Sequence, residues 1–177
     1  PGPDHGLDQT ENSLAASGCA PAAHPADREV ADAKIILLAT PMYNYGMPAA
    51  LKAWFDQVVR IGKTFTFDLA RGDRPLEPMF SGKTLVLLTS WGEFGFGPGE
   101  LNQGRDSLTP HVRTASRYLG VDEFHHIGIE YQEFGDRRFE TSREAAFAAI
   151  EPLVESLSGA NSSSSLPGEI ATRIRSP

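Results

Sequence analysis

The sequence predicts an α/β protein in which the strands of one parallel sheet alternate with helices. The apolar run at residues 35–39 and the segment 84–89, in which residues 85–88 are apolar, are typical of strands that are buried on both faces, as in parallel sheets. Each run is followed by a loop rich in Gly and Pro and then by a segment with helical periodicity. The resulting order of strand, helix, strand, helix, strand, helix implies right-handed crossovers between parallel strands.

The first strand, residues 35–39, leads into a loop that contains Pro41, Asn44, Gly46 and Pro48. Pro48 suits the first position of a helix, where its missing N–H costs nothing. Apolar residues then recur with helical spacing and define one buried face, made of Leu51, Trp54, Phe55, Val58 and Val59. The loop follows the carboxyl end of the strand, which is where ligands bind in open α/β sheets.

The later elements continue the alternation. Residues 68–81 are expected to form a polar connection to the second strand, a helix is expected over 107–119 with Gly120 ending it, and a third strand over 124–131. Thr141 and Glu144 fit a capping box, so the last helix is expected to begin there. That helix is expected to bury its apolar residues, namely Ala146, Phe147, Ile150, Leu153, Val154 and Leu157.

The chain is long enough for a single domain with its own core, which we expect over residues 25–158 of the 177. Residues 1–24 are rich in Pro, Gly, Ala and Ser and are expected to be irregular. A short helix at residues 27–33 is expected to lead into the first strand. Residues 159–177 include a run of serines and are expected to form a flexible tail.

Composition narrows the function classes. A net charge of −7 gives no attraction to nucleic acid or to an anionic membrane. No apolar run approaches the roughly 20 residues of a membrane span, and the N-terminus has no pattern of a secretory signal. The single cysteine, Cys19, cannot form an intrachain disulfide, which is consistent with a reducing, cytoplasmic location. His125 and His126 are adjacent on a strand and point to opposite faces, so no metal site is predicted.

A specific motif links the first loop to a known family. The segment PMYNYGMPAALKAWFDQVVRIGKTFTF, residues 41–67, resembles the FMN-dependent NADH-azoreductases, also described as NAD(P)H:quinone oxidoreductases of the flavodoxin-like fold. The resemblance covers about residues 26–157 and implies a three-layer α/β/α fold. The family's first strand and Ser-rich phosphate-binding turn have no counterpart before Ile35. We therefore expect the N-terminal strands to be missing or replaced, which would leave residues 35–39 at a sheet edge.

The resemblance also assigns site residues. The first flavin loop corresponds to Pro41, Met42, Tyr43, Asn44 and Tyr45, where the family commonly has Phe at the last position. The second corresponds to Ser90, Trp91, Gly92 and Glu93, where the family usually has Ser-Arg-Gly-Gly. Trp91 removes a cation and Glu93 adds a negative charge, so we expect the stabilisation of reduced, anionic flavin either to be weaker or to come from other donors. Phe65 and Tyr118 match aromatic positions of the acceptor pocket, where a quinone or azo ring could stack.

The predicted function is an FMN-dependent oxidoreductase that takes a hydride from NADH or NADPH and reduces a quinone or an azo compound by ping-pong exchange. The flavin carries the hydride chemistry, so no catalytic acid or base is predicted. The resemblance implies a homodimer in which two subunits build each site. Two alternatives stay open: a flavodoxin-like remnant that serves as a dimerising or partner-binding scaffold without catalysis, and a flavoprotein that passes electrons to another protein. In the same way, the loops could be plain turns and the aromatic residues ordinary packing.

Overall fold

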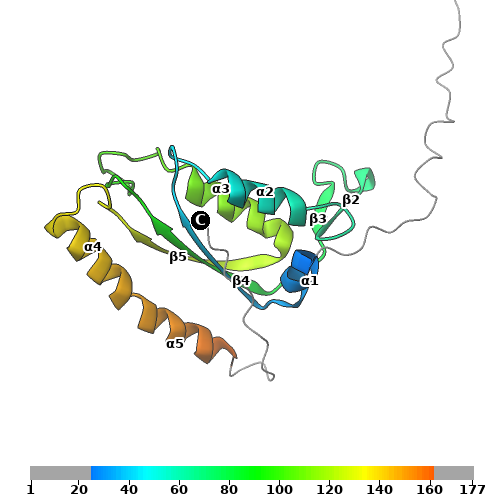
Figure 1. Ribbon diagram of the computed structural model, residues 1–177. Coiled ribbons are helices and arrows are strands. Elements are labelled where there is room, and N and C mark those ends of the chain that lie inside the picture. The colour runs from blue at the N-terminus through cyan, green and yellow to red at the C-terminus, as the bar shows by residue number, and fades with distance from the viewer. Residues whose placement is uncertain (1–24, 162–177) are drawn as a thin grey trace, which may run out of the picture.

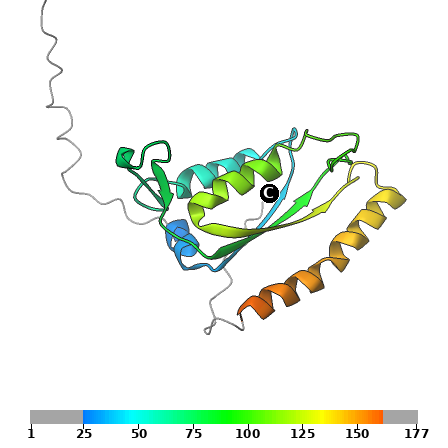
Figure 2. The same ribbon diagram turned by 180° about the vertical axis from the view of Figure 1, so that it is seen from behind.

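The computed structural model describes residues 25–161, and its centre is a parallel sheet with the strand order β1-β4-β5 (Figure 1). Helices α2 and α3 lie on one side of this sheet, and α4 and α5 lie on the other (Figures 1 and 2). The parallel α/β architecture and the three layers are therefore as predicted. The elements of this unit are α1 (Pro25–Asp32), β1 (Ile35–Pro41), α2 (Ala49–Val58), β4 (Lys83–Ser90), α3 (Leu108–Ser116), β5 (Val121–Ile129), α4 (Arg137–Ala148) and α5 (Ile150–Asn161).

The hydrophobic core lies between the sheet and the helices α2 and α3. Alternate residues of the strands point into it, including Ile36 and Leu38 of β1 and the fully buried Leu85 and Leu87 of β4. The predicted apolar face of α2 is confirmed, because Leu51, Phe55 and Val58 are buried in this core and Trp54 and Val59 pack against it. Burial of each large apolar side chain contributes roughly 1.5–3 kcal/mol, so this layer fixes α2 and α3 on the sheet.

The chain between α2 and β4 is more regular than predicted. Strands β2 (Phe65–Phe67) and β3 (Leu76–Pro78) form an antiparallel hairpin, and η2 (Leu69–Arg71) is a 3₁₀ turn between them. The Asp68 carboxylate accepts a hydrogen bond from the Ala70 N–H over 2.9 Å and so caps that turn. Strands this short contain too few residues for a periodic pattern, which explains why the sequence predicted an irregular connection over residues 68–81.

The prediction for the last helix was wrong at its start. Helix α4 begins at Arg137, and the Asp136 carboxylate caps it by accepting from the Arg138 N–H over 2.8 Å. Thr141 and Glu144 therefore lie inside the helix and do not form its N-terminal cap. The Ser142 hydroxyl instead accepts a hydrogen bond from the Glu130 N–H over 2.9 Å, tying the helix to the end of β5.

The burial predicted for this helical segment was also wrong. The segment is split into α4 and α5, and among its apolar residues Ala146 is buried whereas Phe147, at 63% exposed, Ile150 and Val154 face solvent. Leu153 and Leu157 are half-buried. Helix α5 continues to Asn161, past the domain boundary expected at residue 158. The expectations for residues 1–24 and 162–177 lie outside the described residues.

Other boundaries differ by a few residues. Pro48 precedes α2 as its N-cap, β5 starts at Val121, and α3 passes into the 3₁₀ turn η3 (Arg117–Leu119), which Gly120 ends as predicted. Within residues 25–161, β1 is an edge strand that pairs with β4 alone, as expected. No helix in that range is long and apolar enough to cross a membrane.

Candidate functional site

Two loops leave the sheet side by side at the carboxyl ends of β1 and β4. Pro41 pairs with Ser90 in the last register position of these strands. Immediately beyond, the Met42 N–H donates a hydrogen bond to the Ser90 carbonyl oxygen over 3.0 Å. The two segments that the sequence assigned to a cofactor, residues 41–45 and 90–93, therefore form one rim of the sheet.

The first loop has a strained backbone and exposed aromatic side chains. Tyr43 and Gly46 exchange backbone hydrogen bonds of 3.1 and 2.9 Å, which closes a tight turn. Between them Asn44 and Tyr45 adopt φ values of 48° and 62°, and each such left-handed conformation costs a non-glycine residue roughly 1–2 kcal/mol. Tyr43 is 57% exposed and Tyr45 is 39% exposed. Strain of this kind is characteristic of ligand-binding loops.

Asn44 is available to bind a ligand. Its backbone N–H and its side-chain amide hydrogen bond to no other residue among 25–161. Unpaired donors beside apolar and aromatic side chains such as Met42 and Tyr43 suit the polar edge of a flat heteroaromatic ring. The first loop therefore fits the isoalloxazine ring of FMN in its chemistry.

In the second loop, Trp91 is a packing residue. Its side chain is only 7% exposed and lies against Phe96, with ring centroids 4.9 Å apart, and against His126, at 5.3 Å. Its Nε1 has no hydrogen-bond partner in the described part of the chain. The buried ring of Trp91 thus anchors the second loop to the protein, whereas the rings of Tyr43 and Tyr45 face solvent.

Glu93 connects the two loops. Both of its carboxylate oxygens accept from the Tyr45 hydroxyl, at 3.1 and 3.2 Å. The Asn102 side-chain amide donates to the same carboxylate over 3.2 Å and to the Phe94 carbonyl over 2.8 Å. Asn102 is only 5% exposed. Its role was not predicted, because an asparagine in a Gly-rich loop carries no sequence signal of its own.

A third loop, between β5 and α4, also joins this rim and was not predicted as part of the site. The N–H groups of Tyr131, Gln132 and Glu133 donate to the carbonyl oxygens of Glu93, Trp91 and Gly92, at 3.0, 3.0 and 3.2 Å. A Cβ atom at Gly92 would lie 2.5 Å from the carboxylate of Glu133, whose exposed and flexible side chain could turn aside. The parallel sheet could have indicated this loop, because it too follows the carboxyl end of a strand.

Aromatic side chains cover the junction of the second and third loops. Tyr131, whose φ is 64°, stacks on Phe94 with ring centroids 4.4 Å apart and planes 13° apart. Phe134 packs edge-on against both rings. The Arg138 guanidinium lies over all three rings and pairs with Asp136. That hydrogen bond holds the pKa of the Asp136 carboxyl below its usual value.

A pocket of about 620 Å³ lies behind the second loop, between β5 and α4. Trp91, His126, Asp106 and Ala146 are among the residues that line it. The Thr89 hydroxyl and the His126 Nε2 are 2.8 Å apart. Burial lowers the pKa of His126, with a smaller opposing effect from the Asp106 carboxylate. The volume of this pocket is within the range of small-molecule sites.

The aromatic residues assigned to the acceptor pocket lie elsewhere in the same chain. Phe65 in β2 and Tyr118 in η3 contact each other with ring centroids 5.2 Å apart. They lie at the end of α2 and α3 that is remote from the loops (Figure 1). One chain thus brings Phe65 and Tyr118 to each other but not to the loops at residues 41–45 and 90–93.

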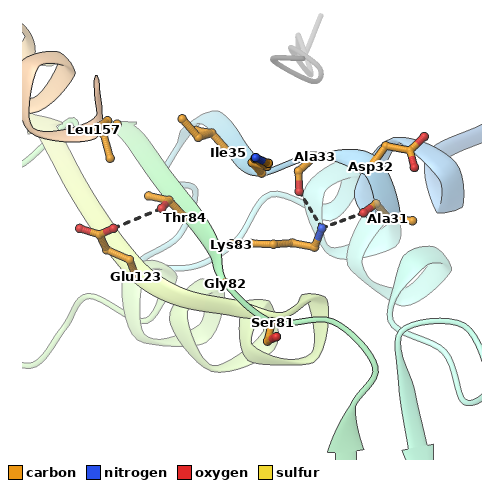
Figure 3. Close-up of a pocket in the computed structure, with 11 residues that line it drawn as sticks. Ala31, Asp32, Ala33, Ile35, Ser81, Gly82, Lys83, Thr84, Glu123 and Leu157 are labelled. Atoms are coloured by element: carbon orange, nitrogen blue, oxygen red, sulfur yellow. Dashed lines mark hydrogen bonds between the residues drawn. The ribbon is translucent and has the colours of Figure 1, made fainter. Parts of the chain in front are cut away.

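A second pocket, of about 390 Å³, lies at the amino ends of the strands (Figure 3). Lys83 reaches across it and donates to the carbonyl oxygens of Ala31 and Ala33, at 2.9 and 2.6 Å, so it caps the end of α1. This pocket is at the opposite edge of the sheet from the loops. Over residues 25–161, no group of three or more His, Cys, Asp or Glu side chains could hold a metal ion.

An open parallel sheet with adjoining loops at its carboxyl edge defines a doubly wound α/β protein of the kind that binds nucleotide cofactors. A family model described as a flavodoxin-like fold matches residues 6–153. The chain belongs to that family. The resemblance was expected to start at about residue 26, and the match begins earlier, at residue 6.

Curated relatives agree with the family that residues 41–67 indicated. The chain is 61% identical over 129 residues to FMN-dependent NADH:quinone oxidoreductase 2 of Colwellia psychrerythraea, covering 73% of this chain and 59% of the relative. It is 41% identical over 128 residues to FMN-dependent NAD(P)H:quinone oxidoreductase 1 of Pseudomonas aeruginosa, covering 72% and 60%. The chain therefore spans about 60% of the length of these relatives.

Solved structures show the same fold. An azoreductase from Bacillus anthracis strain Sterne aligns with a TM-score of 0.59 at 20% identity, covering 72% of this chain and 60% of that one. An FMN-dependent NADH-azoreductase from Bacillus anthracis strain Ames Ancestor, solved in complex with FMN, aligns with a TM-score of 0.54 at 13% identity, covering 70% and 61%.

Proposed function

We propose that this chain acts as an FMN-dependent NAD(P)H:quinone oxidoreductase that also reduces azo compounds. The observation that carries the proposal is the joining of the two loops by the Met42–Ser90 hydrogen bond, which sets the exposed aromatic residues and the unpaired donors of Asn44 on one rim. The names of the relatives, up to 61% identical, support the same cofactor and substrate class.

The loop residues would hold the ring end of FMN. Bound FMN supplies the chemistry of accepting a hydride from NADH or NADPH and passing electrons to a quinone or azo acceptor. Asn44 would donate to the polar edge of the ring from its amide and backbone N–H. Met42, Tyr43 and Tyr45 would pack on the ring and exclude water from it. Pro41 and Ser90 fix where the loops leave the sheet, and the Gly92 carbonyl oxygen accepts a hydrogen bond from the Glu133 N–H of the third loop.

Trp91 and Glu93 would act on the cofactor indirectly. The Trp91 ring is buried and backs the second loop, so we assign it to support of that loop. The carboxylate of Glu93 places a negative charge at the rim, which disfavours a reduced, anionic flavin.

The acceptor wall would come from a second copy of the chain. Phe65 and Tyr118 lie at the far end of α2 and α3, so a homodimer that sets the Phe65–Tyr118 pair of one copy against the loops of the other would complete a pocket for a flat acceptor. The single cysteine, Cys19, is consistent with action in the cytoplasm.

The test is FMN binding followed by turnover. We expect the full chain to quench FMN fluorescence with a micromolar or lower Kd and to sustain NADH oxidation beyond one equivalent only when a quinone or azo dye is present. Tyr43→Ala is expected to weaken FMN binding about tenfold, through loss of a stacked side chain worth roughly 1–2 kcal/mol. Phe147→Ala, which removes an equally exposed aromatic side chain from α4, is the matched control and should leave FMN binding unchanged.

Two outcomes would contradict the proposal. If FMN does not bind at micromolar concentration, the chain is a scaffold without flavin chemistry. If FMN binds but NADH is not oxidised with any quinone or azo dye, the chain is an electron carrier to another protein.

A further inference from the structure

Two departures from the family pattern meet each other in space. Tyr45 stands where the first flavin loop commonly has Phe, and Glu93 stands where the second usually has Gly. The Tyr45 hydroxyl donates to the Glu93 carboxylate, with distances of 3.1 and 3.2 Å to its two oxygens. Phe has no hydroxyl and Gly has no carboxylate, so the typical residues could not form this bond. The Tyr45 and Glu93 side chains are chemically complementary.

The carboxylate of Glu93 is also held in place by a residue other than Tyr45, namely Asn102. The Asn102 amide donates to it over 3.2 Å, and Asn102 is itself fixed by further hydrogen bonds. Its amide also donates to the Phe94 carbonyl at 2.8 Å, its N–H donates to the Gly95 carbonyl at 2.7 Å, and its side-chain oxygen accepts from Arg105 at 3.2 Å. Because Asn102 is 5% exposed, the Gly-rich loop after Glu93 presents a preorganised acceptor.

Tyr45 is held at its other end as well. Its backbone is left-handed, at φ 62°, and its carbonyl oxygen accepts from the Ser107 N–H over 2.8 Å. Ser107 lies just before α3, at the end of the segment 91–107 that connects β4 to α3. Tyr45 is thus bound near both ends of that segment, at Glu93 and at Ser107. A strained conformation persists only where several contacts determine it together.

We propose that Tyr45 and Glu93 form a latch that closes the two loops into one rigid rim, and that the charge of Glu93 makes a flavin held there harder to reduce. Both are positioning residues. The latch itself follows from the hydrogen bonds, whereas its effect on the flavin rests on the proposed function.

A double-mutant cycle tests the latch. We expect Tyr45→Phe and Glu93→Ala each to raise the rate of amide hydrogen exchange about fivefold in residues 42–47 and 91–105 of the protein without FMN. We expect the double variant to exchange no faster than either single one, because both substitutions remove the same bond. Tyr43→Phe removes a neighbouring hydroxyl outside the latch and should leave these exchange rates unchanged. Alanine at position 93 avoids the added backbone freedom of glycine.

A second measurement separates charge from hydrogen bonding. The amide oxygen of Glu93→Gln can still accept from Tyr45, so the exchange rates should stay at the wild-type values. Without the negative charge, the midpoint potential of bound FMN should rise. We expect Tyr45→Phe to raise the FMN Kd about three- to tenfold.

The latch is overturned if the two single variants act additively on hydrogen exchange, or if Tyr45→Phe behaves as Tyr43→Phe does. An unchanged midpoint potential in Glu93→Gln overturns the electrostatic effect alone. The exchange experiment contains no FMN, so failure of the protein to bind FMN would end the proposed function without deciding the latch.

Discussion

The backbone N–H of Met42 lies 3.0 Å from the carbonyl oxygen of Ser90, one residue beyond the last paired position of β1 and β4. This bond extends the pairing of two parallel strands into the loops that follow them. The positions of those loops therefore depend on the sheet and its core more than on the loop residues. Substitutions inside the loops can then change a ligand site without changing the fold, which makes the following variants informative.

Asn44 separates backbone strain from side-chain chemistry. Its φ is 48°, a conformation that glycine adopts freely and a β-branched residue does not. Asn44→Gly is expected to leave the free energy of unfolding within about 0.5 kcal/mol of the wild type, and Asn44→Val to lower it by roughly 1–3 kcal/mol. If the side-chain amide binds the flavin ring, Asn44→Gly should still weaken FMN binding about fivefold. Urea unfolding and FMN titration measure the two effects, and equal unfolding curves for both variants would contradict the strain.

Gly120 and Gly82 provide a matched pair of glycines. Both have positive φ, at 85° and 73°, so alanine at either position carries the left-handed strain of roughly 1–2 kcal/mol. At Gly120 a Cβ atom would also lie 2.5 Å from the backbone of Phe80, whereas at Gly82 it would meet nothing within 4 Å. We expect Gly120→Ala to cost about 2–5 kcal/mol and Gly82→Ala only the strain. Equal losses in thermal or urea unfolding would contradict the close contact between Phe80 and the end of η3.

The fold could be predicted where hydrophobic periodicity was strong. The continuous apolar runs around Leu38 and Leu87 and the spaced apolar residues Leu51, Phe55 and Val58 all lie in the core. The start of α4 could not be predicted in this way, because Phe139 is the only apolar residue in its first two turns. Asp136 and Thr141 both follow capping rules, and only the tertiary position of Ser142 at the end of β5 decides between them.

The site could be predicted only in part. Pro41 and Ser90 meet because parallel strands carry their loops at the same edge, a rule that needs no coordinates. The contact of Tyr45 with Glu93 spans 48 residues of sequence and depends on the path of a long Gly-rich loop. Neither periodicity nor spacing describes such a path. The inward turn of the Trp91 ring is likewise a consequence of packing against Phe96 and His126.

A substitution of Lys83 tests how helix α1 is held at the amino ends of the strands. Its ammonium group donates to the carbonyl oxygens of Ala31 and Ala33 at the end of α1 (Figure 3). Lys83→Met keeps the length of the side chain but leaves both carbonyls without this donor, at a cost of roughly 1–3 kcal/mol. Lys52→Met, which breaks an exposed pair with Asp56 on α2, is the control and should cost at most about 0.5 kcal/mol. Chemical denaturation of both variants measures the difference, and equal losses would show that Lys83 does not anchor α1.

The lowered pKa of His126 leads us to expect a loss of stability in mild acid. Burial lowers the pKa of its imidazole below the usual 6.5; the Asp106 carboxylate opposes this shift and the Arg113 guanidinium adds to it. Between the lowered pKa of the folded protein and 6.5, the unfolded chain binds more protons than the folded one, so the free energy of unfolding rises with pH. The stabilisation is present above about pH 6.5 and is lost as the pH falls through the folded pKa.

Urea unfolding at several pH values between 7.5 and 5 tests this, with His126→Gln as the comparison. Glutamine can still hydrogen bond to the Thr89 hydroxyl, which lies 2.8 Å from the imidazole, but it does not titrate. The wild type should therefore lose more stability than the variant as the pH falls below 6.5, and the two should respond alike above pH 7. Parallel curves over the whole range would mean that the folded protein leaves the proton affinity of His126 unchanged. In that case the ring is more open to water than its contact with Trp91 implies.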